Sequence, residues 1–158
     1  MALIRYFILV ILLGAMICLP TGPVLAISPT EEDQILGTWK NIGFIYQGEF
    51  RLPLNPNLIL LFEFHADGTN EIFWARQNEP GFCERKGKYS IIDHRLEDEV
   101  VWINPDNNIE CSQDPDMRLG RKASNEIRFK DGKFHLYLSL AGDPFIYVFD
   151  RLPTDDRP

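Results

Sequence analysis

Hydrophobic and polar residues alternate with a period of two along most of the chain after residue 37, which is typical of half-buried β-strands. In the stretch Lys133–Leu140, for example, Phe134, Leu136 and Leu138 share one face. The pattern predicts eight strands, at about Thr38–Tyr46, Asn57–His65, Asn70–Arg76, Cys83–Ile92, Leu96–Ile103, Lys122–Lys130, Lys133–Leu140 and Phe145–Leu152.

Only one helix is predicted, a short one near the start of this pattern. Ser28 can cap it, Pro29 suits its first position, Glu31 completes a capping box, and Gly37 ends it. No long helix is available to connect parallel strands, so an antiparallel meander is expected. The predicted fold is all-β, an eight-stranded antiparallel up-and-down barrel with a short N-terminal helix, because eight strands can close and leave no edge.

The connections between the predicted strands differ in length, and their order assigns them to the two ends of such a barrel. Tight hairpin turns are predicted at Ala66–Gly68, Asp93–His94 and Lys130–Gly132, which would share one end. Longer connections are predicted at Gln47–Pro56, Gln77–Phe82 and Asn104–Arg121, which would share the other. We call the second end the loop-rich end, and it is where small barrels open to a ligand.

The first 26 residues differ in composition from the rest. They carry a single charged side chain, Arg5, followed by an apolar run over 6–19 and a small-residue site at Val24–Ala26. This is the pattern of a secretory signal peptide, and the run is too short for a comfortable membrane span. We expect residues 1–26 to be removed and residues 27–158 to form one barrel domain, periplasmic or secreted, with no stable membrane anchor. A retained N-terminal anchor is the alternative.

Charge and cysteine content narrow the possible partners and the compartment. The chain carries a net charge of −7, which disfavours binding to nucleic acid or to anionic lipid. Beyond the leader, two cysteines remain, Cys83 and Cys111, and an even count in an exported chain predicts one disulfide. Two free thiols are the alternative. Both positions fall at the loop-rich end, so the bond would pin the connection Asn104–Arg121 beside the barrel mouth.

Three short motifs resemble those of the lipocalin-like (calycin) barrels, especially the short bacterial lipocalin-like domains. They are the run Leu36–Lys40, the hairpin Phe62–Thr69 and the triplet Gly87–Tyr89. In that superfamily a Gly-x-Trp opens the first strand, and an Arg at the end of the last strand stacks over the Trp. The resemblance therefore implies that Trp39 and Arg151 are structural residues that close the base of the barrel.

Candidate ligand-binding residues are those expected to face the interior near the mouth. Pairing across the Asp93–His94 turn would place Tyr89 opposite Asp98 and Arg85 opposite Trp102. An interior Arg in an aromatic cup suits a carboxylate on an apolar ligand. The predicted ligand-binding residues are Phe73, Arg85, Tyr89, Trp102 and Tyr147. Two alternatives remain: Arg85 can form a structural ion pair with Asp98, and the aromatic rings can fill the barrel as core.

No arrangement of residues typical of catalysis or of a cofactor site is evident, so we expect neither an enzyme nor a bound metal or cofactor. The histidines, at positions 65, 94 and 135, match no standard zinc spacing. The connection before residue 121 holds several acidic residues that could bind calcium, but it lacks the spacing of a calcium loop. A solvated acidic loop is the preferred interpretation.

The sequence thus predicts an exported, monomeric, non-catalytic barrel that binds a small apolar or amphipathic molecule. The alternative is a protein-interaction module, such as a periplasmic inhibitor of a cell-wall-degrading enzyme. In that case the acidic run Asp114–Asp116, at the loop-rich end, would contact a basic partner such as lysozyme. A third hypothesis is a barrel enzyme for a hydrophobic substrate, which would use Arg85, Asp98 and Tyr89.

Overall fold

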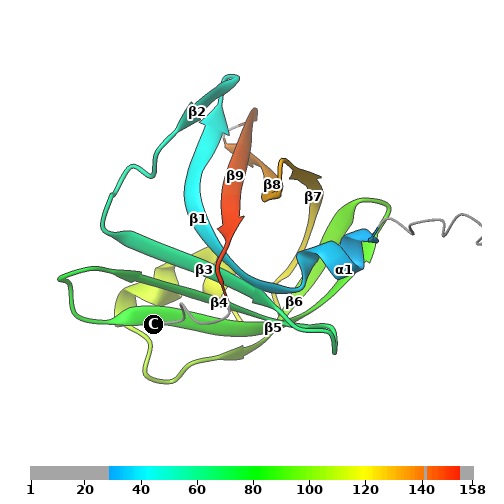
Figure 1. The fold of residues 1–158 in the computed structure, drawn as a ribbon. Helices are drawn as coiled ribbons and strands as arrows, with labels where there is room; N and C mark the ends of the chain where they lie inside the picture. The colour runs from blue at the N-terminus through cyan, green and yellow to red at the C-terminus, as the bar shows by residue number, and fades with distance from the viewer. Residues whose placement is uncertain (1–28, 141, 154–158) are drawn as a thin grey trace, which may run out of the picture.

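The computed structural model describes residues 29–140 and 142–153, and the predicted leader, residues 1–26, lies outside them. The described strands form one antiparallel sheet of nine, in which eight close into a barrel and the short strand β2 extends the sheet beside β1 (Figure 1). The elements are α1 (Glu31–Ile35), β1 (Gly37–Tyr46), β2 (Glu49–Arg51), β3 (Leu58–Phe64), β4 (Thr69–Arg76), β5 (Phe82–Ile92), β6 (Arg95–Ile103), the 3₁₀ helices η1 (Ile109–Gln113) and η2 (Pro115–Met117), β7 (Lys122–Lys130), β8 (Lys133–Leu140) and β9 (Asp143–Arg151).

Closure comes from β1, which pairs with β3 on one side and with the last strand, β9, on the other. The predicted fold class is therefore confirmed. Two predicted connections hold structure of their own. The one after β1 turns back at Gln47-Gly48, both with positive φ, and forms the three-residue strand β2 against β1. The one after β6 contains η1 and η2, whose N-caps are Asn108 and Asp114.

The short helix α1 begins at a different cap from the one predicted. Thr30 is the N-cap: its hydroxyl accepts a hydrogen bond from the Asp33 amide, and the Asp33 carboxylate accepts one from the Thr30 amide, each at 3.2 Å. The prediction of Ser28 as the cap was wrong, and Ser28 lies outside the described residues. The reason is that Thr30 and Asp33 form a complete capping box by themselves, which leaves Pro29 ahead of the helix.

The N-terminal helix and the ends of β1 and β9 close one end of the barrel. The Trp39 indole donates a hydrogen bond of 2.6 Å to the Ile35 carbonyl. The Arg151 guanidinium stacks 4.3 Å from the Trp39 ring and donates to the carbonyls of Gln34 and Leu36. The predicted structural pair of Trp39 and Arg151 is confirmed. Buried residues above it form the main core: Ile35, Trp39, Phe62, Phe64, Leu96, Ile127, Phe134, Leu136 and Phe149.

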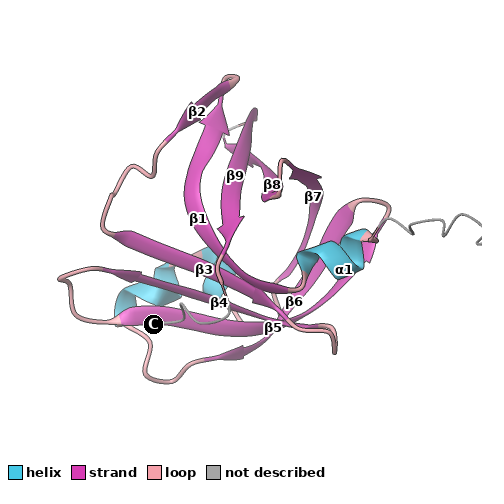
Figure 2. Ribbon diagram, in the orientation of Figure 1, coloured by secondary structure: helices cyan, strands magenta, loops and turns pink. Residues whose placement is uncertain are grey.

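The connections divide between the two ends as predicted. The tight turns lie at the closed end, and two of them, Asp93-His94 and Asp131-Gly132, have positive φ at both residues, as tight hairpins require. The long connections lie at the opposite end. Figure 2 shows α1 at the closed end and the 3₁₀ helices at the loop-rich end.

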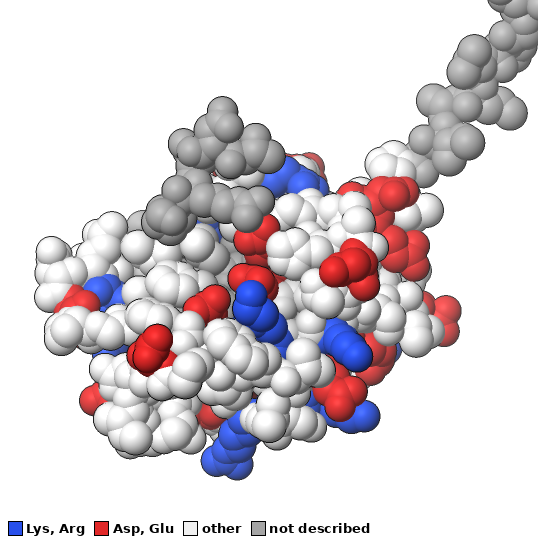
Figure 3. Space-filling view, turned by 90° about the horizontal axis from the view of Figure 1, so that it is seen from below, with Lys and Arg blue, Asp and Glu red and all other residues white. Residues whose placement is uncertain are grey.

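The outer surface carries both signs of charge. On the face drawn in Figure 3, acidic and basic side chains are interspersed, and acidic ones gather near the start of the described chain, where α1 contributes Glu31, Glu32 and Asp33. No helix among the described residues is long and apolar enough to cross a bilayer.

Candidate ligand-binding site

A cavity of about 340 Å³ occupies the loop-rich half of the barrel. Its apolar wall consists of Leu58, Leu60, Phe62, Ile72, Trp74, Leu96, Met117, Ala123, Leu136, Leu138, Tyr147 and Phe149. Its polar lining consists of Arg76, Arg85, Asp98, Asp114, Asp116, Arg121 and Asn125. Side chains therefore fill the barrel interior at the closed end, whereas a cavity remains at the loop-rich end.

The residues of the apolar wall are the inward-facing ones of neighbouring strands. In β3 and β4, Leu60 faces Trp74, and the next inward pair toward the closed end is Phe62 and Ile72. In β8 and β9, Leu136 faces Tyr147 in the same way. Because every second residue of a strand shares a face, these pairs form successive layers from the mouth to the floor.

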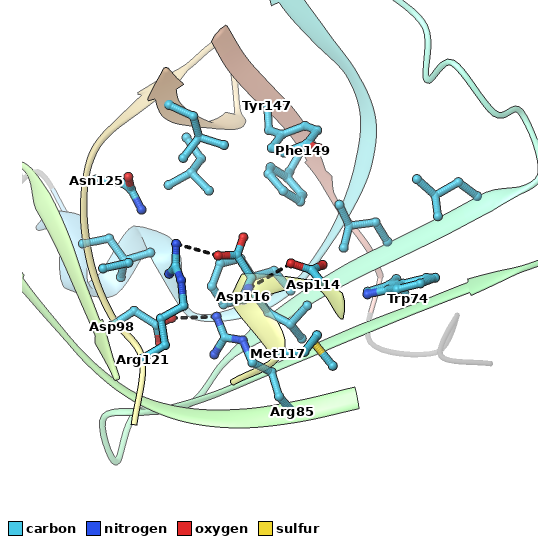
Figure 4. A pocket seen from close by; sticks show the side chains of 18 of the residues that line it. Trp74, Arg85, Asp98, Asp114, Asp116, Met117, Arg121, Asn125, Tyr147 and Phe149 are labelled. Carbon is cyan, nitrogen blue, oxygen red and sulfur yellow. Dashed lines mark hydrogen bonds and ion pairs between the residues drawn. The ribbon is translucent and has the colours of Figure 1, made fainter. Parts of the chain in front are cut away.

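The segment containing η2 lies across one side of the mouth. Asp114 caps it, accepting a hydrogen bond of 2.8 Å from the Asp116 amide, and Pro115 occupies its first turn. The Asp116 carboxylate pairs with the Arg121 guanidinium at 2.6 Å. Figure 4 shows the carboxylates of Asp114 and Asp116 rising from η2 into the cavity, on the side facing Tyr147. The predicted acidic loop is thus part of the cavity lining.

A disulfide holds this segment against the barrel. Cys83 in β5 and Cys111 in η1 are bonded, which confirms the predicted pairing. Both are buried, and Met117 and Trp74 pack against them. The amide of Glu84 donates a 2.7 Å hydrogen bond to the side chain of Asn107, which ties the same connection to β5 a second time. The mouth segment is therefore anchored to the rigid sheet.

Removal of the disulfide is expected to destabilise the chain substantially. It closes a loop with a sequence separation of 28 residues. The double substitution of Cys83 and Cys111 by alanine should lower the free energy of unfolding by about 3.5 kcal/mol, since the unfolded chain regains its loop entropy. Urea unfolding measures this. Dithiothreitol should lower the free energy of unfolding of the native chain by a similar amount and should not change that of the double variant. A loss well below about 1 kcal/mol in the double variant would contradict the expectation.

A buried polar network lies on the floor side of the cavity. Arg85 Nη2 donates to Asp98 Oδ2 at 2.6 Å, and Asn70 Nδ2 donates to Asp98 Oδ1 at 2.7 Å. All three residues are buried. A Cβ on Gly87 would lie 2.6 Å from both Asn70 Oδ1 and Asp98 Oδ1, so only glycine leaves room for the network. The glycine of the sequence motif is thus explained.

The network does not satisfy all of its own polar atoms. Among the described residues, the buried side-chain atoms without a hydrogen-bond partner are Arg85 Nε, Arg85 Nη1 and Asn70 Oδ1, and all three belong to it. Buried polar groups in folded proteins are nearly always paired with protein, water or ligand. The cavity floor therefore offers two unpaired donors.

The pKa of the Tyr147 hydroxyl is affected by burial and by the acidic residues at the mouth. Burial raises the pKa of its hydroxyl above the ordinary value, and the carboxylates of Asp116 and Asp114 raise it further. The phenol is consequently neutral at physiological pH. The two carboxylates act on this ring from the opposite side of the cavity.

Of the five predicted ligand-binding residues, the structure brings two into the cavity lining. These are Arg85 and Tyr147. Tyr89 pairs with Asp98 as predicted, but its ring packs on Phe64 and its hydroxyl donates to the His65 carbonyl at 2.9 Å. It belongs to the core at the closed end and does not line the cavity.

Phe73 and Trp102 lie on the outer face, so their predicted inward orientation was wrong. Both faces of β4 carry large apolar side chains, so hydrophobicity does not show which face is inward. The Glu71 carboxylate pairs with Lys86 outside the barrel at 2.6 Å, so the face that carries Glu71 is the outer one. Phe73 shares that face and stacks on Phe82. In β6 a register shift places Trp102 opposite Lys86 instead of Arg85. Such a bulge reverses the faces beyond it.

Several lining residues were not predicted as ligand-binding residues. Trp74 is the largest, and it would have been found by assigning Asn70, rather than Glu71, to the inner face of β4. Met117 and Arg121 lie in the connection after β6, where no strand period applies. Only the Asp-Pro-Asp capping pattern marks that segment in the sequence.

Comparison with known proteins supports the fold assignment. No family model and no curated protein sequence matches the chain. Among solved structures, a lipocalin-like protein from Bacteroides uniformis superposes with a TM-score of 0.50 at 15% identity, covering 75% of this chain and 99% of that one. The chain has a lipocalin-like fold. An amine-binding protein of Rhodnius prolixus, solved with tryptamine, gives a TM-score of 0.39 at 15% identity, covering 77% and 66% of the two chains.

In this lipocalin-like barrel, the Gly-Thr-Trp triplet and the cavity lie at opposite ends. Trp39 contacts α1 and the core, whereas the cavity is lined from Leu58 and Arg76 inward. This triplet therefore carries no information about the ligand. That information lies in the cavity lining.

Proposed function

We propose that this lipocalin-like barrel binds a small apolar or amphipathic molecule in its cavity, without catalysis. The observation that carries the proposal is the cavity itself, about 340 Å³ in volume and walled mainly by Leu, Ile, Phe and Trp side chains. Ligand sites are typically concave and mostly apolar, with a few polar groups that fix orientation. This cavity has that composition.

Burial of apolar ligand surface would supply the affinity. Each 100 Å² of apolar surface withdrawn from water contributes about 2.5 kcal/mol. At about 30 Å³ per water-sized group, the cavity has room for about eleven such groups. A ligand of this size would fit between the β3–β4 wall and the β8–β9 wall.

The polar lining favours binding over catalysis. Asp98 and Asp116, which line the cavity, are each held in an ion pair at 2.6 Å. No Ser, Cys or His of the described residues lines the cavity. Ser, Cys and His are common nucleophiles and proton-transfer groups, and the described lining holds none of them. The acid–base groups that it does hold outside an ion pair are Asp114 and Tyr147.

Export is part of the proposal. It is supported by the leader-like composition of residues 1–26 and by the disulfide, which forms in oxidising compartments. Cell fractionation of the full chain, with N-terminal sequencing of the product, tests it. A protein that begins near Ile27 outside the cytoplasm supports export, and an intact N-terminus in the cytoplasm contradicts it.

Filling the cavity should weaken the binding of an apolar probe. Ala123 lines the cavity, whereas Ala75 alternates with the lining residues Trp74 and Arg76 and so faces outward. Titration with N-phenyl-1-naphthylamine should give a Kd at least about tenfold weaker for Ala123→Trp than for the native chain, since the indole occupies apolar surface that the probe would bury. The matched control Ala75→Trp should bind normally. Equal loss in both variants, or no binding to the native chain, would contradict the proposal.

A second candidate function is contact with a protein partner at the loop-rich end. Leu52, Leu54, Ile109 and Leu119 lie on the long connections there and are between 69% and 92% exposed. Exposed apolar groups of this kind favour an interface. Titration with a basic lysozyme tests the inhibitor hypothesis: loss of lytic activity that is relieved by Leu54→Ser would support it, and unchanged activity would contradict it.

A further inference from the structure

The polar network at the cavity floor selects among ligands. The geometry points to an uncharged hydrogen-bond acceptor on the ligand, such as an amide, ketone or alcohol oxygen, bound at Arg85 with the apolar chain directed toward the mouth. This inference rests on the proposed function and specifies the ligand class for the same cavity.

The unpaired atoms of Arg85 define what the ligand must supply. Arg85 lines the cavity and is 3% exposed, yet its Nε and Nη1 have no partner among the described residues. Both groups are donors, and a guanidinium cannot act as an acceptor. A ligand acceptor placed there would remove the cost of burying them, which is a larger effect than a hydrogen bond made at the surface.

The charge of Arg85 is already balanced. Asp98 accepts its Nη2 donor at 2.6 Å, and the orientation of the neighbouring Asn70 is fixed because its Nδ2 also donates to Asp98. A carboxylate ligand would place a second anion beside Asp98 and leave the buried group with a net negative charge. Such a charge is costly to bury without a partner.

The carboxylates at the mouth strengthen the argument against an anionic ligand. The charged residues that line the cavity at the mouth are Asp114, Asp116, Arg76 and Arg121. Arg121 pairs with Asp116 and Arg76 pairs with Glu79, so Asp114 is the one of these four without an ion pair among the described residues. An anionic headgroup would pass Asp114 on its way to the floor. An ammonium group, in turn, has donors only and cannot satisfy Arg85.

The direction of the ligand follows from the register of the strands. Leu58 opposes Arg76 at the mouth, and the pairs Leu60–Trp74 and Phe62–Ile72 follow inward. Ile72 in turn opposes Arg85, and Asn70 lies one layer deeper. An acceptor at Arg85 would therefore be the innermost part of the ligand, with its chain against these apolar layers.

Calorimetric titration with matched eight-carbon ligands tests the inference at pH 7.5, where octanoate is ionised and octylamine is protonated. Octanamide should bind roughly tenfold more tightly than octanoate or octylamine, since neither of those two supplies an uncharged acceptor. Octan-1-ol should follow octanamide. Equal affinities, or tighter binding of octanoate or octylamine, would overturn the inference.

A double variant assigns the effect to Arg85. Arg85→Met combined with Asp98→Asn removes one charge of each sign and both donors. In this variant the affinities of octanamide, octanoate and octylamine should converge to within about threefold, because the guanidinium donors are gone. The amide introduced at position 98 can donate to Asn70 Oδ1, which has no partner among the described residues. Retention of the full preference for octanamide would overturn the role of Arg85.

A measurement on the native chain keeps the test independent of that variant. The Arg85 Nε–H resonance should shift on addition of octanamide and stay in place with octylamine; a shift with neither would overturn the inference. Failure of the proposed function is distinguishable, since N-phenyl-1-naphthylamine would then fail to bind at all. If that probe binds and the eight-carbon ligands do not discriminate, only the inference fails.

Discussion

Arg85→Met is expected to lower the free energy of unfolding by about 3–5 kcal/mol, because the change leaves the Asp98 carboxylate buried without its cation. Asp98 is 8% exposed, and its remaining partner, Asn70, is neutral. The loss should therefore exceed that of an ordinary hydrogen bond. Urea unfolding monitored by circular dichroism gives the difference.

The double variant Arg85→Met with Asp98→Asn should recover most of that stability, since both charges leave the core together. An exposed ion pair provides the matched control: Arg128 and Glu126 are 2.8 Å apart with side chains 50% and 41% exposed. Arg128→Met should cost less than about 1 kcal/mol. Equal losses for Arg85→Met and Arg128→Met would show that the Arg85–Asp98 pair is not buried in solution.

Trp39→Ala should also destabilise the barrel by about 3–5 kcal/mol, through loss of a large buried ring. The indole packs against Phe129 and Phe134 and donates a hydrogen bond to the Ile35 carbonyl, and Arg151 stacks on its face. Its removal detaches α1 from the base as well as leaving a cavity. Thermal and urea unfolding measure the loss.

Trp102 supplies the control for this substitution, as it lies on the outside and contacts Lys86. Trp102→Ala should change the free energy of unfolding by less than about 1 kcal/mol. Because Trp39 lies at the closed end, Trp39→Ala should leave the affinity for an apolar probe nearly unchanged wherever the variant is folded. Loss of probe binding in the folded variant would indicate that the two ends are coupled.

Regular strands explain why much of the fold could be predicted. β7 and β8 have the predicted bounds, because alternation continues without interruption along both strands up to the tight turn that joins them. The same regularity placed Tyr147 in the cavity lining and Tyr89 opposite Asp98. Short local patterns were enough there, since each inward residue follows from its neighbour two positions away.

Prediction failed where the alternation is interrupted or ambiguous. The bulge before Trp102 inserts a residue without any marker in the sequence, and it turns that ring outward. Phe73 and Trp74 are adjacent large rings, so hydrophobicity alone does not assign the inner face. The inner face is identified by the partners of Glu71 and Asn70, which are Lys86 in β5 and Asp98 in β6.

The mouth segment illustrates a further limit. Asp114 and Asp116 are typical of a solvated loop by composition, yet they line the cavity because the disulfide and Met117 hold η2 over it. The disulfide itself was predictable from cysteine count and placement. The contacts of the segment held by the disulfide could not be predicted, since they depend on the closure of the barrel.

The central claim is that the cavity at the loop-rich end takes a small apolar or amphipathic molecule. Intermolecular nuclear Overhauser effects between bound N-phenyl-1-naphthylamine and the leucine methyl groups of the native chain test it most directly. The account predicts contacts to Leu60, Leu136 and Leu138, which line the cavity. Contacts confined to Leu52 and Leu54 on the exposed rim, or none at all, would contradict it.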